Sequence, residues 1–141
     1  MNIKVVETKA EKDQAFHVRN IVFVDEQNVP PEIEVDEHDD TAIHFIGYED
    51  GEPIAAGRMR WVDEYGKLER ICVLKEHRGK NYGKEMILFI EDIIQDKGNK
   101  KAKLNAQKHA EGFYKSLGYK TVSGEFMDAG IPHVTMVKEL D

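Results

Sequence analysis

Three features follow one another in the middle of this chain of 141 residues: an apolar run, a basic loop with two glycines and a long amphipathic helix. The apolar run is Ile71 to Leu74, and the loop extends from Glu76 to Gly83. Beyond it, apolar residues recur at helical spacing: Met86, Ile87, Ile90, Ile93 and Ile94. This periodicity predicts a helix that buries one face and ends at Gly98. A strand joined by a loop to such a helix is typical of an α/β fold.

Signals before this segment predict a helix and an antiparallel meander. Thr8 to Glu11 form a capping-box pattern, so we expect a helix to begin there. Its core face runs to about Val24, and the segment Asn28 to Pro31 stops it because proline cannot continue helical hydrogen bonding. Asp50-Gly51 and Tyr65-Gly66 predict the turns of two hairpins.

The other strands are predicted from runs of apolar and β-branched residues. We expect strands near residues 3–6, 43–48, 53–62, 67–74, 103–106, 120–126 and 133–138, and a short helix over 110–117. The order β-α-β-β-β-α-β-α-β-β predicts an α/β fold of the α+β type, with a mixed sheet of about six to seven strands and helices on both faces. The length predicts one domain over residues 1–141.

Composition narrows the class of protein. Hydrophobic residues make up 40% of the chain, which is enough for one core without a metal or a disulfide. Cys72 is the single cysteine, and its apolar surroundings predict a small buried hydrophobe rather than a catalytic thiol. No apolar stretch is long enough to span a membrane, and the N-terminus has no signal-peptide pattern. We therefore expect a cytoplasmic protein.

The charges are distributed unevenly along the chain. A net charge of -7 argues against a general nucleic-acid binder. No Lys or Arg occurs between Arg19 and Arg58, where acidic residues gather: Asp25, Glu26, Glu32, Glu34, Asp36, Glu37, Asp39 and Asp40. Basic residues gather later in the chain: Lys75, Arg78, Lys80 and Lys84. The acidic segment lacks the spacing and the turn glycine of a calcium loop, so we expect no metal.

The basic loop has the chemistry of an anion site. The first backbone N–H groups of a helix have no internal partners, and the helix dipole is positive at that end. Glycine lets a ligand approach the backbone closely, and Arg78, Lys80 and Lys84 add the charge that a pyrophosphate needs. The spacing matches neither the Walker loop nor the dinucleotide-binding glycine motif, so an ordinary nucleotide cofactor is not expected.

Two motifs resemble those of the GNAT superfamily of acetyl-CoA-dependent N-acetyltransferases. Arg78-Gly79-Lys80-Asn81-Tyr82-Gly83 is similar to the superfamily's cofactor loop, with Asn81 at the place of its middle glycine. Asparagine enters the left-handed backbone region more readily than most residues. The stretch Gln107 to Tyr119 is similar in spacing to the second motif, with Gln107 in place of the usual Asn. Segments resembling the ElaA-like branch of small bacterial acetyltransferases are 22–27, 104–107 and 129–133.

The resemblance implies that acetyl-CoA is bound as a co-substrate. Arg78 and the backbone amides from Gly79 to Lys84 would bind its pyrophosphate. The backbone that would pair with the pantetheine arm is that of Ile71, Cys72 and Val73. One N–H of this strand would point toward the thioester oxygen, where negative charge develops. Asn105 or Gln107 is a candidate to hydrogen-bond the arm, with a helix-cap or strand-end role as the alternative for each.

Acetyl transfer also requires a proton donor and a group that accepts the amine proton. The resemblance implies that Tyr114 is the general acid toward the CoA sulfur, and the alternative is that Tyr114 packs in the core with Phe113. Three residues are candidates for the general base: Glu69, Glu26 and His133. The alternative for Glu69 is an exposed strand residue, and a lone histidine is more often structural.

Together these patterns predict an enzyme, an N-acetyltransferase in which an amine attacks acetyl-CoA directly while both substrates are bound. The expected partner is an amine of a small molecule or a peptide; neither nucleic acid nor a membrane is expected, and a homodimer is left open. One alternative is an acyl-CoA-binding or sensor module without catalysis, against which Tyr114 argues. The other is an interaction protein that uses its acidic loop to bind a basic partner.

Overall fold

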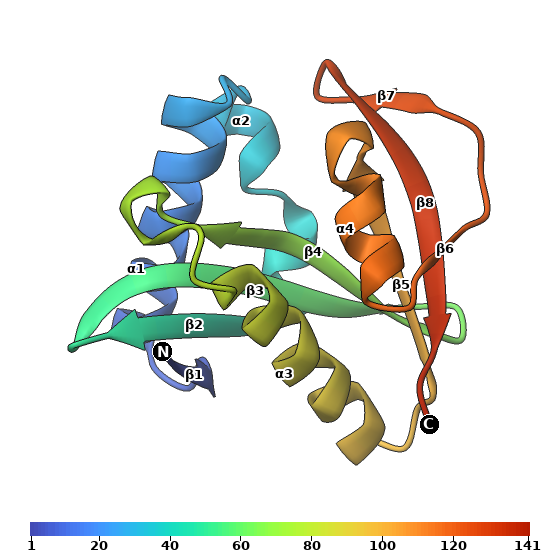
Figure 1. Ribbon diagram of the computed structural model, residues 1–141. Coiled ribbons are helices and arrows are strands. Elements are labelled where there is room, and N and C mark those ends of the chain that lie inside the picture. The colour runs from blue at the N-terminus through green and yellow to red at the C-terminus, as the bar shows by residue number, and fades with distance from the viewer.

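The computed structural model describes residues 1–141, which fold around a sheet of eight strands (Figure 1). The strands lie in the order β1-β2-β3-β4-β5-β8-β6, and β7 pairs with β8. The bounds of β1 to β8 are Asn2–Val5, Ile43–Glu49, Glu52–Val62, Tyr65–Val73, Lys101–Gln107, Lys120–Thr121, Phe126–Asp128 and Ile131–Glu139. β4 and β5 pair in parallel and all other neighbours are antiparallel, which confirms the expected mixed sheet.

Helices cover both faces of the sheet, as expected. α1, Lys9–Arg19, packs on β2, β3 and β4, and α3, Tyr82–Asp96, packs on β3, β4 and β5 from the opposite face. Successive residues of a strand point to opposite faces. Phe45 therefore lies in the core under α3, and Ile46 lies in the core under α1. The short helix α4, Glu111–Ser116, lies beside β5 and β6.

The buried face of α3 holds this helix on the sheet. Its fully buried residues are Met86, Ile87, Ile90 and Ile94. Ile93, which belongs to the same predicted pattern, is only partly buried. Burial of one such side chain contributes about 1.5–3 kcal/mol to stability. These contacts fix the helix, and with it they fix the loop that leads into its N-terminus. Gly98 follows the helix with a φ of 85°, in agreement with the predicted end.

The first helix begins where the capping box predicts. The Thr8 hydroxyl accepts a hydrogen bond from the Glu11 N–H at 3.1 Å, and the Glu11 carboxylate accepts one from the Thr8 N–H at 3.1 Å. This reciprocal pair satisfies two backbone donors that the helix itself leaves free. Ala15 and Val18 then point into the core beneath the helix.

The chain remains helical beyond α1 and past Val24, where the predicted core face of the first helix ends. It continues as π-helical turns over Asn20–Glu26 and leaves the helix at Asn28, whose φ is 61°. The acidic segment that follows contains two short helical elements where the sequence predicted only a loop: α2, Pro31–Glu34, and a 3-10 turn over Glu37–Asp40. Pro31 occupies the first turn of α2, where its missing N–H costs nothing.

One of the two predicted hairpin turns is displaced. Asp50-Gly51 joins β2 to β3 as expected, but Tyr65 and Gly66 are already paired in β4, so that prediction was wrong by two residues. The chain turns at Asp63, which takes a φ of 54°. Gly66 is needed for packing, because a Cβ there would lie 2.5 Å from Cδ1 of Ile94 on α3.

The sheet has more strands than the six to seven expected, because the run 120–126 forms two short strands instead of one. β6 and β7 both pair with β8, and the pairing is interrupted between them after the Val122 N–H donates to the Thr135 carbonyl at 2.9 Å. There the Ser123 hydroxyl accepts a hydrogen bond from the Thr135 N–H at 2.8 Å, in place of a backbone carbonyl. No helix of the structure has the length and apolar character needed to cross a bilayer.

β4 and β5 separate at one end, and this separation creates the candidate site. Their pairing is limited to Gly66–Leu68 with Ala102–Leu104. Beyond these residues, Glu69–Val73 of β4 and Asn105–Gln107 of β5 have no pairing with each other. The edge of β4 that faces β5 is therefore free to hydrogen-bond an extended ligand.

Candidate active site

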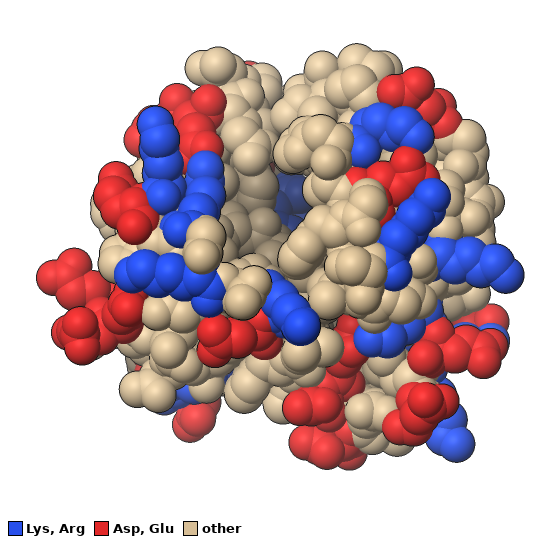
Figure 2. Space-filling model, in the orientation of Figure 1, with Lys and Arg blue, Asp and Glu red and all other residues tan.

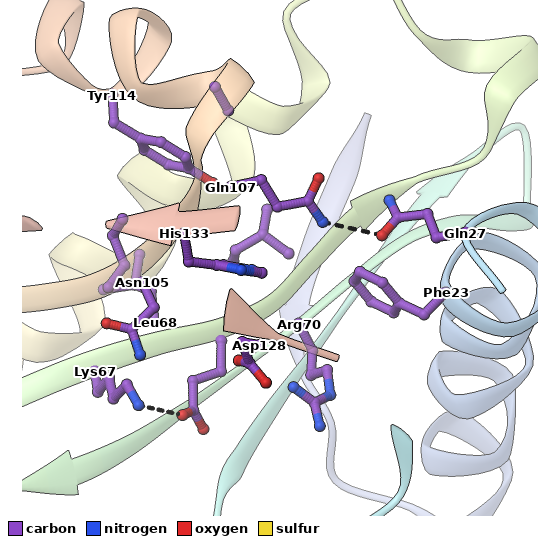
Figure 3. A pocket seen from close by; sticks show the side chains of 14 residues that line it. Phe23, Gln27, Lys67, Leu68, Arg70, Asn105, Gln107, Tyr114, Asp128 and His133 are labelled. Carbon is purple, nitrogen blue, oxygen red and sulfur yellow. Dashed lines mark hydrogen bonds and ion pairs between the residues drawn. The ribbon is translucent and has the colours of Figure 1, made fainter. Parts of the chain in front are cut away.

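A cavity of about 270 Å³ occupies the gap between β4 and β5 (Figure 3). We call it the central cavity. Its lining residues are Phe23, Gln27, Lys67, Leu68, Glu69, Arg70, Ile71, Leu104, Asn105, Gln107, Ala110, Tyr114, Asp128 and His133. They come from the end of the first helix, both separated strands, α4 and the β7–β8 hairpin. Segments far apart in the sequence thus converge on one small volume.

A second hollow of about 470 Å³ runs along the loop before α3, and we call it the loop groove. Four residues line both hollows: Gln27, Ile71, Ala110 and Tyr114. Figure 2 shows the molecule hollowed between its two halves, with largely uncharged walls and basic side chains on the rim above this loop. The two hollows therefore meet at Ile71 and Tyr114, between a basic rim and the polar central cavity.

The loop has the backbone shape that its sequence predicts. Gly79 takes a φ of 83°, and Asn81, at the place of the middle glycine, takes a left-handed φ of 65° and precedes the first turn of α3. The prediction that asparagine substitutes for glycine here is confirmed. A Cβ on Gly83 would meet no atom within 4 Å, so the backbone at the head of α3 is open to an approaching ligand. Lys80 and Lys84 are exposed beside it.

Arg78 and Glu26 hold each other at the rim of the loop groove. The guanidinium donates to both carboxylate oxygens, at 2.6 and 2.8 Å, and its Nε donates to the Val73 carbonyl at 2.9 Å. The hydrogen bond from Arg78 holds the pKa of Glu26 below its ordinary value. Glu26 lines neither hollow, so the structure places it beside the loop and apart from Tyr114 and His133.

Glu49, at the end of β2, ties the loop to the sheet. Its carboxylate accepts a hydrogen bond from the Tyr82 hydroxyl at 2.7 Å and lies 2.7 Å from Nδ1 of His77. Lys80 lies 3.5 Å from the same carboxylate. These contacts fix the loop to the end of β2. Hydrogen bonding from Tyr82 and His77 keeps the pKa of Glu49 below its ordinary value, against a smaller opposing effect of burial.

Cys72 faces the core, while its strand borders the groove. Its side chain is 5% exposed and packs with Ala15, Val18 and Ala56 under α1. Burial raises the pKa of the Cys72 thiol to about 12, so the thiol stays protonated. This confirms the prediction of a buried hydrophobe. Ile71, on the other side of the strand, lines both hollows.

Tyr114 projects from α4 toward the point where the two hollows meet (Figure 3). Its ring contacts Phe113 and Tyr119 edge to face, with centroids 5.2 and 6.0 Å apart. No protein group hydrogen-bonds the hydroxyl, and burial raises its pKa to about 12. Phe113 is 43% exposed, so the two rings do not form a shared core. Tyr114 therefore presents a protonated phenol to the gap.

His133 lies on β8 at the inner wall of the central cavity. Its ring is 9% exposed, stacks on Phe126 at 6.0 Å, and has Nδ1 2.7 Å from the Ile131 carbonyl. A carbonyl only accepts hydrogen bonds, so this contact places the proton on Nδ1. Nε2 then keeps its lone pair and has no protein partner. His133 thus lines the same cavity as Tyr114.

Glu69 lines the same cavity but is surrounded by cations. Its Oε1 accepts from Arg58 at 3.0 Å and Arg60 at 2.9 Å, and its Oε2 lies 2.9 Å from the Lys67 ammonium. Burial alone would raise the pKa of Glu69, but Lys67 and the two arginines outweigh it and lower that pKa. Both oxygens are engaged, so this carboxylate is a weaker proton acceptor than Nε2 of His133.

The acidic segment is joined to the sheet by buried ion pairs. Arg19 donates to Glu34 at 2.7 Å and to Asp39 at 2.7 Å, and Arg58 donates to Asp36 and Asp39 at 2.8 Å. Glu34 and Asp39 are each 3% exposed. Much of the acidity of this segment is therefore neutralised inside the protein, which removes the main support for an exposed basic-partner surface.

Amide side chains bridge the gap between the first helix and β5. Gln107 donates from Nε2 to Oε1 of Gln27 at 2.9 Å (Figure 3). Nε2 of His109 lies 2.7 Å from Oε1 of Gln107. Asn105 accepts a hydrogen bond from the Thr135 hydroxyl at 2.9 Å while lining the central cavity. Both predicted amide residues thus lie at the gap.

Several residues of the central cavity were not among the predicted site residues: Phe23, Gln27, Lys67, Arg70 and Asp128. Gln27 lies in the segment 22–27, which resembles the ElaA-like branch. That resemblance did not indicate what the Gln27 side chain does. Arg70 takes a φ of 57°, which nothing in its sequence context predicts for a residue with a Cβ. No group of three or more His, Cys, Asp or Glu residues is arranged to hold a metal ion.

A separated pair of parallel strands, with a basic glycine-containing loop at one end and a buried tyrosine phenol in the gap, is suited to an acyl-CoA-dependent acyltransferase. Comparison with known proteins agrees. Residues 7–140 match the family model of the acetyltransferase (GNAT) domain, and the chain belongs to the GNAT family of N-acetyltransferases.

Relatives and solved structures cover the whole chain. The uncharacterised N-acetyltransferase YjcF of Bacillus subtilis is 45% identical over 140 residues, which are 99% of this chain and 100% of that protein. The crystal structure of a Lactobacillus plantarum protein assigned as an N-acetyltransferase superposes with a TM-score of 0.92 at 26% identity, covering 99% and 97% of the two chains. Escherichia coli ElaA gives a TM-score of 0.86 at 26% identity, covering 98% and 99%.

Proposed function

We propose that this enzyme transfers acetyl from acetyl-CoA to an amine of a small molecule or peptide by direct attack within a ternary complex. The observation that carries the proposal is the meeting of the loop groove and the central cavity at Tyr114, with Nε2 of His133 in the same cavity. One hollow leads from a basic loop and the other is enclosed by polar side chains. Two substrates entering from opposite sides would meet beside a proton donor and a proton acceptor.

Acetyl-CoA would lie along the loop groove. Arg78, Lys80 and the free amides at the head of α3 would hold its pyrophosphate. The pantetheine arm would extend along the unpaired edge of β4 at Ile71 to Val73, as an added strand does. Binding by Arg78 would draw the guanidinium from Glu26, and this carboxylate belongs to the helix end that also carries Gln27.

In the reaction, Nε2 of His133 accepts the proton that the amine loses, and the amine nitrogen forms a bond to the thioester carbon. A backbone N–H of the unpaired β4 edge stabilises the charge that develops on the carbonyl oxygen. The carbon–sulfur bond then breaks, and the Tyr114 hydroxyl donates a proton to the departing sulfur. Cys72 has no part in this scheme, because its thiol is buried and its pKa is raised.

The test is release of CoA thiol from acetyl-CoA in the presence of a panel of amines. We expect amine-dependent release, with kcat at least about tenfold lower in His133→Ala. The loss should be smaller with weakly basic amines, because they are already neutral and need less help from a base. His38→Ala serves as the matched control, since His38 lines neither the central cavity nor the loop groove. CoA binding without release for any amine would instead indicate an acyl-CoA-binding module.

A further inference from the structure

Two charged groups of the central cavity, Arg70 and Asp128, have polar atoms that no protein group engages. Arg70 donates from Nε and Nη2 to the Glu34 carbonyl at 3.2 and 3.0 Å, and Nη2 lies 3.3 Å from Asp36. Its Nη1 makes no hydrogen bond within the protein. The Asp128 carboxylate, on β7, makes neither a hydrogen bond nor an ion pair. Figure 3 shows both side chains at the same cavity, and both also line a smaller side cavity next to it.

The other carboxylates near this cavity are neutralised. Glu34 pairs with Arg19, and Asp36 pairs with Arg58 and, through Nη2, with Arg70. Glu69 is shared by three cations. The cavity therefore presents the free Nη1 of Arg70 and the carboxylate of Asp128, which has no partner, and this arrangement is complementary to a zwitterion. A ligand that carried only positive charge would leave Nη1 of Arg70 facing a like charge.

Arg70 has an unusual backbone conformation, which determines the direction of its side chain. Its φ of 57° puts it in the left-handed region, which is uncommon for a residue with a Cβ, and such residues often occur at binding sites. The pairing of β3 with β4 shifts register close by, between Ala56 and Arg58. A β-bulge of this kind changes the direction in which a side chain points. Burial and the nearby Arg58 and Arg19 lower the pKa of Arg70, so a bound anion would relieve an unfavourable environment.

The side cavity adds an apolar wall. It has a volume of about 80 Å³ and shares Arg70, Asp128 and His133 with the central cavity. Its apolar lining residues are Phe23, Val29, Ile33, Ala129 and Ile131. A ligand held at Arg70 would thus have a pocket for a small aliphatic group beside its charged end.

We infer that the acetyl acceptor is a free α-amino acid with an apolar side chain, an inference that rests on the proposed function. Nη1 of Arg70 binds its carboxylate, and Asp128 attracts its ammonium group until His133 accepts the proton. The aliphatic side chain enters the side cavity. Transfer then forms the amide bond of an N-acetyl amino acid, breaks the thioester bond and leaves CoA as the free thiol.

The first test compares three acceptors in the wild-type enzyme: L-leucine, L-leucinamide and isoamylamine, which is leucine without its carboxylate. Because a hydrogen bond to a charged group is strong, kcat/KM for leucine should exceed that for either of the others by at least about tenfold. Cadaverine, a diamine without a carboxylate, should also be a poor acceptor. Equal or faster turnover of isoamylamine or cadaverine would overturn the inference.

The second test uses Arg70→Gln with Arg60→Gln as the matched control. Arg70 also holds the Glu34 carbonyl, so its loss lowers activity toward every acceptor by loosening the acidic segment. The diagnostic quantity is therefore the ratio of kcat/KM for leucine to that for isoamylamine. This ratio should fall at least about tenfold in Arg70→Gln and stay constant in Arg60→Gln, since Arg60 lines neither cavity. An equal loss for both acceptors would contradict a carboxylate site.

A binding measurement separates this inference from the proposed function. Titration of leucine into the CoA-saturated wild-type protein should give a calorimetric signal that is weakened in Arg70→Gln. If leucine binds in this manner but is never acetylated, the carboxylate site stands and the proposed transfer fails. If leucine neither binds nor reacts, the inference fails, whatever happens with other amines.

Discussion

At the scale of single residues, the environment decides the protonation state of each group in the site. Burial raises the pKa of Tyr114 to about 12, so its phenol keeps its proton throughout the neutral range. The Ile131 carbonyl keeps the proton of His133 on Nδ1 and leaves Nε2 as an acceptor. With the imidazole neutral, Tyr114 is therefore a hydrogen-bond donor and Nε2 of His133 is an acceptor in the same cavity.

The first prediction concerns Tyr114→Phe. The ring still fills its space, so the affinity for CoA should stay within about twofold, while kcat falls at least about tenfold because the departing sulfur lacks its proton donor. The loss should shrink with an acyl donor whose thiol is more acidic. Steady-state rates and calorimetric CoA affinities measure both effects.

Tyr119→Phe is the control for Tyr114→Phe. Tyr119 is 3% exposed and donates to Glu91 at 2.8 Å, so its loss should lower the free energy of unfolding by about 1 kcal/mol or more and leave kcat unchanged. If Tyr114→Phe turned over at the wild-type rate with chemistry limiting, Tyr114 would not be the general acid.

Sequence motifs placed Tyr114 and Arg78 at the site, since both belong to recurring patterns. Arg70 and Asp128 were missed for a physical reason. Arg70 reaches the cavity through a left-handed backbone, and Asp128 through a hairpin that turns at Ala129 and Gly130. The conformation of Arg70 accompanies the irregular pairing of β4 with β3, and the hairpin that places Asp128 turns at Ala129, whose φ of 52° is not one that alanine favours. The choice of His133 among the three candidate bases likewise depended on tertiary contacts.

At the scale of elements, the loop before α3 combines three requirements in a few residues. Gly79 and Asn81 supply left-handed turns, Arg78 supplies charge, and Gly83 leaves the head of the helix uncovered. The loop is fixed from behind by Glu49 and by the buried face of α3. The Arg78 guanidinium is held by Glu26, so a bound anion would have to compete with this ion pair.

The second prediction concerns Gly83→Leu. No atom lies within 4 Å of a Cβ at this position and its φ is not positive, so the fold should tolerate the change. The added side chain would cover the amides at the head of α3 and weaken CoA binding by at least about tenfold, the loss of a charge-assisted hydrogen bond. Calorimetry measures the affinity, and thermal unfolding measures the stability.

Gly112→Leu is the matched control for the loop. Gly112 is an exposed helical glycine of α4, and a Cβ there also has no neighbour within 4 Å, but it lines neither hollow. CoA affinity should be unchanged in this variant. An unchanged affinity in Gly83→Leu as well would mean that the loop is a turn without a role in binding.

Helices with strong local sequence signals were predicted correctly. The turn and the strands whose positions depend on tertiary packing were not. The capping box of Thr8 and the periodicity of α3 located two helices correctly. The Tyr65-Gly66 turn failed because Gly66 is required by the contact with Ile94 rather than by a turn. The division of residues 120–126 into β6 and β7 also depends on tertiary contacts, with Ser123 bonding to β8.

At the scale of the whole molecule, the buried ion-pair network joins the first helix, the acidic segment and the sheet. Burial alone would raise the pKa of Asp39, but hydrogen bonds from Arg19 and Arg58 outweigh it and hold this pKa well below its ordinary value. The pKa of Asp36 is lowered in the same way, mainly by Arg58. The sequence showed an acidic run between two arginines, but not that the run folds onto them.

The third prediction is acid sensitivity that depends on Asp39. A carboxyl whose pKa is lowered by folding stabilises the protein above its unfolded pKa of about 3.9 and loses that contribution as the pH falls toward its folded pKa. The free energy of unfolding should therefore decrease below about pH 4. Urea titrations across this range, followed by circular dichroism, measure the slope.

Asp39→Asn identifies the source of this slope. It removes the carboxylate that Arg19 and Arg58 share, while Arg19 keeps Glu34 and Arg58 keeps Asp36 and Glu69. It should therefore lower the free energy of unfolding at neutral pH by about 3 kcal/mol and flatten the acid slope. Asp40→Asn, at the exposed neighbouring position, should change neither. The same slope in Asp39→Asn as in the wild type would show that other carboxylates cause the acid sensitivity.

The measurement that tests the central claim most directly is the initial rate of CoA thiol release with acetyl-CoA and the acceptor amine varied independently. Direct attack in a ternary complex predicts no release without an amine, double-reciprocal lines that intersect, and acetyl found on the amine and never on the protein. Parallel lines together with an acetyl group on the protein would contradict the account.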